Sequence, residues 1–167
     1  CDAKAHGAGR EIDVVDVLTG RLIGRASSGT YRTADVVGLD TLAHVIKGMK
    51  DRLADDPWRK YYNAPEWVTA MIQRGELGNK TGFGIYKRDG KEFTVFDPAK
   101  QSYVRSTAKA DPTVEAILKL KDPVEKLTGL RKSDHPQAQL VWRSYRDLFH
   151  YSAYHLADIA SNARDLD

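Results

Sequence analysis

Apolar residues recur at intervals of three or four positions along much of the chain. The longest such run is Leu39, Leu42, Ile46, Met49 and Leu53. This spacing predicts an α-helix that buries one continuous apolar face. Thr33 is a good N-cap for that helix, and Asp35 falls in its first turn, where a negative charge complements the helix dipole. The Asp-Asp-Pro sequence at 55–57 then ends the helix.

Shorter helices are predicted on either side. A brief apolar stripe over residues 12–22 indicates a short helix followed by a turn, and residues 25–31 are small and polar, which is typical of a loop. A helix over residues 65–75 has proline at its first position and glycine at its end. Its spacing turns four apolar residues inward, namely Trp67, Val68, Met71 and Ile72.

The last third of the chain is also predicted to be helical. Asp-Pro pairs at 111–112 and 122–123 supply an N-cap and a first helical residue, so we expect short helices that reach Leu120 and Leu130. A long helix is expected from Pro136 to about Arg164, because apolar residues keep helical spacing there without an intervening glycine or proline.

Between these helical regions the apolar residues no longer recur at helical spacing. Residues 84–88 and 92–96 are rich in β-branched and aromatic residues and are joined across Asp89-Gly90, a strong hairpin signal. Tyr103-Val104 is expected to add a short extended segment. The fold class predicted from the pattern is therefore mainly α, with one small β-hairpin at about residues 84–96.

Composition narrows the class of protein. Of the 167 residues, 41% are hydrophobic and 29% charged, which is typical of a globular chain. The 26 Lys and Arg residues alternate with 23 Asp and Glu residues, so no basic stretch suited to nucleic acid appears and no nucleic-acid partner is expected. No apolar run is long enough to cross a membrane, and the single cysteine, Cys1, excludes an intrachain disulfide and fits a cytoplasmic location. Residues 1–10 lack an initiator methionine and are expected to be a tail of a longer chain.

Candidate chemistry is sparse. Gly78-Asn79-Lys80-Thr81-Gly82 contains a Lys-Thr pair, but a phosphate-binding loop needs glycine before the lysine and a strand before the loop, so we interpret this segment as a tight connector. His44, His150 and His155 do not share the spacing of metal ligands, and no metal site is expected. No Gly-x-Gly-x-x-Gly follows a predicted strand, so these residues build no dinucleotide site of their own.

Two segments resemble a known family. Residues 31–42, Tyr-Arg-Thr-Ala-Asp-Val-Val-Gly-Leu-Asp-Thr-Leu, are similar to the Asp-x-x-Gly-Leu-Asp segment of the C-terminal domain of 3-hydroxyacyl-CoA dehydrogenases. Residues 78–87 resemble the Gly-x-Lys-x-Gly-x-Gly-Phe-Tyr segment that closes the same domain. Residues 24–31, which replace a Pro-x-Gly-Pro-Phe turn of many members, look more like the bacterial multifunctional branch fused to an enoyl-CoA hydratase.

The resemblance implies a domain organisation and a function. Residues 11–105 would be the helical C-terminal domain, and residues 106–167 would begin a second, degenerate helical repeat. The whole protein would be an NAD-dependent oxidoreductase of fatty-acid β-oxidation, acting on acyl-CoA, and its NAD-binding domain and catalytic His-Glu pair would lie upstream. This chain would form a wall of the acyl-CoA cleft and a dimer contact, and would be inactive alone.

The site residues that follow from the resemblance are few. No catalytic and no cofactor-binding residue is carried over, because the motifs that hold them are absent from residues 1–167. Lys80 and Lys87 are the candidates for contact with CoA phosphates, as point charges. The alternative function is a non-enzymatic helical module that binds an acidic partner.

Overall fold

The computed structural model describes residues 12–166 and consists of two units. The first ends at Lys109 and the second begins at Ala110. The predicted tail at residues 1–10 lies outside the described residues. The interpretation of the second unit as a degenerate repeat stays a prediction.

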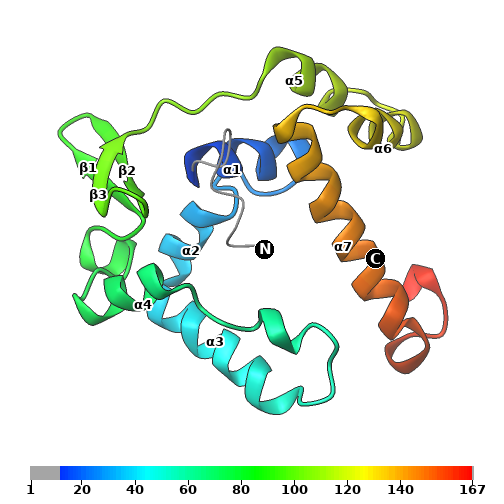
Figure 1. Cartoon of the computed structure of the whole chain (residues 1–167), viewed down its shortest axis with the longest axis horizontal. Coiled ribbons are helices and arrows are strands. Elements are labelled where there is room, and N and C mark those ends of the chain that lie inside the picture. Colours follow the sequence, from blue (N-terminus) through cyan, green and yellow to red (C-terminus); the bar gives the residue numbers. More distant parts are fainter. Residues whose placement is uncertain (1–11, 167) are drawn as a thin grey trace. The chain divides into compact units, whose positions relative to one another are not determined.

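The first unit contains short helices followed by a small sheet (Figure 1). Its helical elements are α1 (Ile12–Thr19), η1 (Arg21–Ile23), α2 (Tyr31–Val37), α3 (Leu39–Arg52), η2 (Arg59–Tyr61), α4 (Glu66–Gln73) and η3 (Asn79–Thr81). Helix α4 begins one residue later than predicted, because Pro65 is its N-cap rather than its first residue, and it buries Val68 and Met71. The predicted mainly helical fold class is confirmed.

The predicted helix start at Thr33 is wrong, because two helices meet where one was expected. Gly38 has φ 99°, a left-handed conformation that interrupts the helix and separates α2 from α3. Thr33 lies inside α2 and its hydroxyl donates to Gly29 O at 2.6 Å. Asp35 therefore belongs to the last turn of a short helix, where a carboxylate does not complement the dipole.

The prediction of one continuous buried face along α3 is also wrong. Leu39 is fully buried at 0% exposure, whereas Leu53 at the far end is 39% exposed. Leu42 and Ile46 are half-buried and line a surface pocket. The apolar spacing thus marks one face of α3 correctly. Only the first part of that face is covered by the same unit, and the second half of the helix leaves it exposed.

The sheet is antiparallel with the order β1-β2-β3 and consists of β1 (Tyr86–Asp89), β2 (Glu92–Asp97) and β3 (Ser102–Arg105). The predicted hairpin is confirmed. Its register pairs Asp89 with Glu92, so the two-residue loop is Gly90-Lys91 rather than Asp89-Gly90. Gly90 has φ 60°, which suits the first loop position of such a hairpin. The extended segment around Tyr103 forms the third strand.

The core of the first unit joins the helices to one face of the sheet. Phe96 stacks on Trp67 with ring centroids 6.0 Å apart and meets Tyr103 edge-on at 5.6 Å. The buried members of this cluster are Ile12, Ala34, Leu39, Val68, Met71, Ile85, Tyr86, Val95 and Phe96. The inward residues of α4 and β2 therefore meet, as the two periodicities require.

The second unit is helical and consists of α5 (Pro112–Leu118), α6 (Pro123–Lys132), α7 (Pro136–Ile159) and η4 (Ala163–Leu166). Asp111 and Asp122 cap α5 and α6 as predicted, with carboxylates that accept from Thr113 N and Glu125 N. The predicted end of the last helix near Arg164 is wrong, because α7 stops at Ile159. Among residues 12–166, no helix has the length and apolarity needed to cross a bilayer.

Candidate functional site

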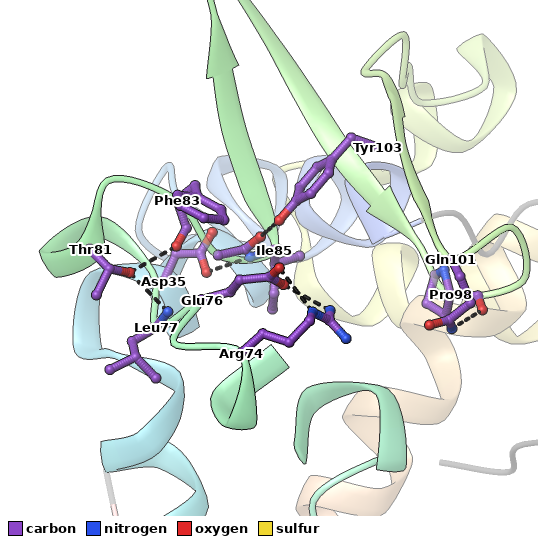
Figure 2. Close-up of polar contacts among 11 residues, drawn as sticks. Asp35, Arg74, Glu76, Leu77, Thr81, Phe83, Ile85, Pro98, Gln101 and Tyr103 are labelled. Carbon is purple, nitrogen blue, oxygen red and sulfur yellow. Dashed lines mark hydrogen bonds and ion pairs between the residues drawn. The ribbon is translucent and has the colours of Figure 1, made fainter. Parts of the chain in front are cut away.

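The two segments that the sequence analysis singled out contact each other through Asp35. Its carboxylate accepts a hydrogen bond from Ile85 N at 2.8 Å (Figure 2). It accepts another from Tyr86 N at 2.8 Å. Asp35 is 3% exposed. Burial raises the pKa of Asp35, and the hydrogen bonds from the backbone of Tyr86 and Ile85 oppose that rise. Asp35 thus fixes the C-terminal turn of α2 to the start of β1.

Two glycines permit this close approach. A Cβ atom at Gly84 would lie 2.3 Å from Asp35 Oδ1, and a Cβ at Gly78 would lie 2.3 Å from Asp35 O. Gly78 also has φ 100°. The glycines of the second segment are therefore required by packing against the aspartate of the first, because any larger residue would overlap with it.

Lys80 is engaged with the first segment as well. Its ammonium lies 2.5 Å and 2.7 Å from the two carboxylate oxygens of Asp40. This hydrogen bond lowers the pKa of Asp40, although both side chains are partly exposed. The Nζ atom lies 3.2 Å from the position of a Cβ at Gly38. A Lys80 that contacts a CoA phosphate would have to share its charge with Asp40.

The neighbouring Thr81 closes the connector (Figure 2). Its hydroxyl accepts from Leu77 N at 2.9 Å and lies 3.1 Å from Phe83 O. Residues 79–81 form a 3₁₀ turn. The Lys-Thr pair is thus occupied by contacts within the protein, which agrees with its interpretation as a tight connector.

Lys87, the second candidate for CoA contact, lies on β1 and is exposed. Its ammonium lies 5.5 Å from the ring centroid of Phe83 and 5.8 Å from that of Tyr103, within the range of cation–π contact. Lys80 is on η3, so different elements position the two lysines. Their role as CoA contacts stays a prediction.

Two further buried aspartates were missed by the sequence analysis. Asp16 accepts from Tyr31 N at 2.5 Å, Arg32 N at 2.9 Å and Tyr86 Oη at 2.7 Å, and so provides acceptors for the first N–H groups of α2. Burial and the bond to Asp16 raise the pKa of the Tyr86 phenol.

Asp13 plays the equivalent part for the segment after β3. Its Oδ2 accepts from Ser106 Oγ at 2.9 Å and from Thr107 N and Ala108 N, each at 3.2 Å. The partners of Asp13 are 93 to 95 residues away in sequence, so no local pattern identifies this role. The acidic residues of this network hold backbone segments together through hydrogen bonds to a charged acceptor, which are stronger than those between neutral groups.

An apolar surface pocket of about 240 Å³ lies among the described residues of the first unit. It is lined by α2, the first two turns of α3, the start of α4 and Ile85. Its walls include Tyr31, Ala34, Val37, Leu42, Ile46 and Trp67. Such a lining suits an aliphatic group.

The described residues include no cluster of His, Cys, Asp or Glu that could hold a metal ion. His135 is the N-cap of α7, where its ring accepts from Gln137 N at 3.2 Å. His150 and His155 lie on α7, five residues apart. The structure therefore offers a hydrophobic surface as its candidate site.

Comparison with known proteins finds the same family that the two segments resemble. Residues 6–88 match the family model of the 3-hydroxyacyl-CoA dehydrogenase C-terminal domain. The "Probable 3-hydroxyacyl-CoA dehydrogenase" of Bacillus subtilis is 36% identical over 159 residues, which are 95% of this chain and 20% of that protein. A protein of the same name from Deinococcus radiodurans is 42% identical over 78 residues, 47% of this chain and 22% of that protein.

A more distant match is the 3-hydroxybutyryl-CoA dehydrogenase of Mycobacterium tuberculosis, 36% identical over 58 residues, 35% of this chain and 19% of that protein. The chain spans about a fifth of the length of these curated relatives. No solved structure matches it. Both segments joined through Asp35 and Asp40 fall within the matched range. Residues 6–88 therefore belong to the family of 3-hydroxyacyl-CoA dehydrogenase C-terminal domains.

Proposed function

We propose that this chain is the helical lobe of an NAD-dependent 3-hydroxyacyl-CoA dehydrogenase of fatty-acid β-oxidation. The observation that carries the proposal is the family match over residues 6–88, within which Asp35 joins the two characteristic segments into one fold. In the whole protein an upstream domain would bind NAD and supply the catalytic His-Glu pair. The chain itself would contribute apolar surface to the acyl-CoA cleft, for which the pocket between α2, α3 and α4 is the suitable wall.

The lengths of the relatives support a long, multidomain parent. The 159 aligned residues are 20% of the Bacillus subtilis protein, which is therefore about 800 residues long. The 78 aligned residues are 22% of the Deinococcus radiodurans protein, which is therefore about 350 residues long. The long relative aligns over nearly the whole chain, both units included, whereas the short one aligns over less than half. This contrast favours the multifunctional branch, with a second helical repeat that begins in the second unit.

The proposal is tested with the longer reading frame that contains this chain. We expect a strand followed by Gly-x-Gly-x-x-Gly upstream, and NADH oxidation by the longer protein in the presence of acetoacetyl-CoA. The 167 residues alone should neither oxidise NADH nor bind it in a calorimetric titration. Turnover by the isolated chain, or a longer protein without dehydrogenase activity, would contradict the proposal.

Self-association is part of the same proposal. Val36 on α2 and Val45 on α3 are 64% and 52% exposed, and we propose that these two apolar side chains belong to the contact between two copies. We expect the chain to sediment as a dimer, and the Val36→Glu/Val45→Glu double variant to sediment as a monomer. Val124→Glu, at a 70% exposed valine of α6, is the matched control and should leave the dimer intact. A monomeric unsubstituted chain at high concentration would contradict this part.

A further inference from the structure

One end of the apolar pocket is bordered by a lysine. Leu39, Ala43 and Ile46 line the pocket from α3, and Lys50 lies four residues beyond Ile46. Residues at this spacing share a helix face, so Lys50 continues the pocket side of α3 about 6 Å further along the axis. The chain after α3 turns back alongside the helix before it enters α4 (Figure 1).

Hydrogen bonds hold this end together. Lys50 Nζ donates to Asn63 Oδ1 at 2.5 Å, and Asn63 directly precedes Ala64 and Pro65, which line the pocket. Arg59 Nε donates to Lys50 O at 2.9 Å. The ammonium of Lys50 is thus bonded to the residue next to the pocket wall at Ala64, and Arg59 is bonded to the same end of α3.

Within residues 12–166, neither Lys50 nor Arg59 forms an ion pair with a carboxylate. The neighbouring Asp51 is paired with Lys47, whose hydrogen bond lowers the pKa of that carboxyl, with Arg59 and Lys50 adding to the effect. Asp56 uses a carboxylate oxygen to accept from Trp58 N at 2.6 Å. The border of the pocket is therefore positive where its walls are apolar.

We propose that this site binds an aliphatic carboxylate of medium length, with the chain in the pocket and the carboxylate between Lys50 and Arg59. A pocket of about 240 Å³ exceeds the cavity of about 150 Å³ that holds a benzene molecule, so it has room for a chain of several methylene groups. The two cations supply charge-assisted hydrogen bonds to the head group. The pocket is the one proposed as a wall of the acyl-CoA cleft, but binding of a free carboxylate uses only residues of this chain and requires neither NAD nor an upstream domain, so it goes beyond the proposed dehydrogenase role.

The experiment is a calorimetric titration of the 167-residue chain with decanoate and, separately, with 1-decanol, which has the same chain and a neutral head. We expect decanoate to bind more tightly than 1-decanol. Lys50→Gln/Arg59→Gln should weaken decanoate at least about tenfold, the value of one charge-assisted hydrogen bond, and leave 1-decanol unchanged. Lys47→Gln, on the same helix but paired with Asp51, is the matched control and should bind decanoate normally.

A second variant tests the pocket itself. Ala43→Met fills space between α3 and the opposite wall, and should weaken decanoate and 1-decanol alike while circular dichroism shows an unchanged helix content. Decanoate binding that is absent, or equal in the Lys50/Arg59 variant, would overturn the proposal. So would decanoate binding that survives Ala43→Met, because the chain would then lie outside the pocket. None of these results would affect the family assignment or the test of dehydrogenase activity.

Discussion

Ile85 and Asp35 are joined by a hydrogen bond of 2.8 Å, from the backbone nitrogen of Ile85 to the carboxylate of Asp35, across 50 residues of sequence. The carboxylate satisfies two consecutive buried N–H groups, those of Ile85 and Tyr86, that would otherwise lack an acceptor where β1 begins. The Asp35 side chain thereby accepts the backbone hydrogen bonds that a neighbouring strand would otherwise accept. The two characteristic segments of the domain are thus the two halves of one structural contact.

Removal of this carboxylate should destabilise the first unit strongly. Asp35→Ala leaves the N–H groups of Ile85 and Tyr86 buried without an acceptor, and we expect a loss of about 3 kcal/mol in the free energy of unfolding. Urea titration followed by circular dichroism measures it. Asp40→Asn breaks the exposed pair with Lys80, which solvent screens, and should cost much less than Asp35→Ala. If the two variants lost the same free energy of unfolding, the buried hydrogen bonds of Asp35 would contribute no more to stability than the exposed Asp40–Lys80 pair.

Glycine variants distinguish packing from helix propensity. Gly84→Ala places a methyl group 2.3 Å from Asp35 Oδ1, and we expect a loss of about 2–3 kcal/mol as the backbone shifts to relieve the overlap. Gly48→Ala, within α3, meets nothing within 4 Å and should raise stability by about 0.5–1 kcal/mol. Thermal unfolding of both variants tests the pair. A stable Gly84→Ala variant would mean that β1 can move away from α2 without loss.

Alkaline pH should weaken the first unit through its buried phenols. Burial, with a contribution from Glu76, raises the pKa of Tyr103 from 10.0 to about 12. Burial also raises the pKa of Tyr86. The unfolded chain loses these protons near pH 10 while the folded chain retains them, so stability is full below pH 10 and falls between about pH 10 and 12.

The measurement is the free energy of unfolding in urea as a function of pH. Tyr103→Phe loses the hydrogen bond to Gly84 O at every pH, and should also show a shallower fall above pH 10 than the unsubstituted protein. Parallel curves for the two proteins would contradict the assignment of the alkaline transition to Tyr103.

The elements that the sequence predicted correctly are those decided by short-range patterns. Asp111 and Asp122 are N-caps because a carboxylate two or three residues before a free N–H group needs no distant partner. The hairpin follows from the runs of β-branched and aromatic residues on both sides of Asp89-Gly90. The same holds for the inward face of α4.

The errors arise where distant contacts decide the structure. The apolar spacing from Leu39 onward is correct, but it does not reveal that Gly38 adopts a positive φ and divides the helix. Nor does it reveal that the partner of Asp35 lies 50 residues away. The apolar pocket was missed for a related reason, since periodicity predicts which residues share a face but not what covers that face. Its positive border was missed because Lys50 resembles an ordinary surface lysine until Asn63 and Arg59 are placed beside it.

The helices of the second unit should depend on a small core. Leu130 on α6 and Val141 on α7 are both 0% exposed, and α6 packs against α7. Leu130→Ala leaves a cavity, and we expect a loss of about 3 kcal/mol in the stability of this unit, a large part of what so few residues can supply. Trp142 reports on this unit alone once Trp58 and Trp67 are replaced by Phe, so its fluorescence during urea titration gives the measurement. Val124→Ala, at a 70% exposed position of the same helix, should change stability by less than about 0.5 kcal/mol. If both variants shifted the Trp142 transition equally, the packing of α6 on α7 would not be what holds this unit together.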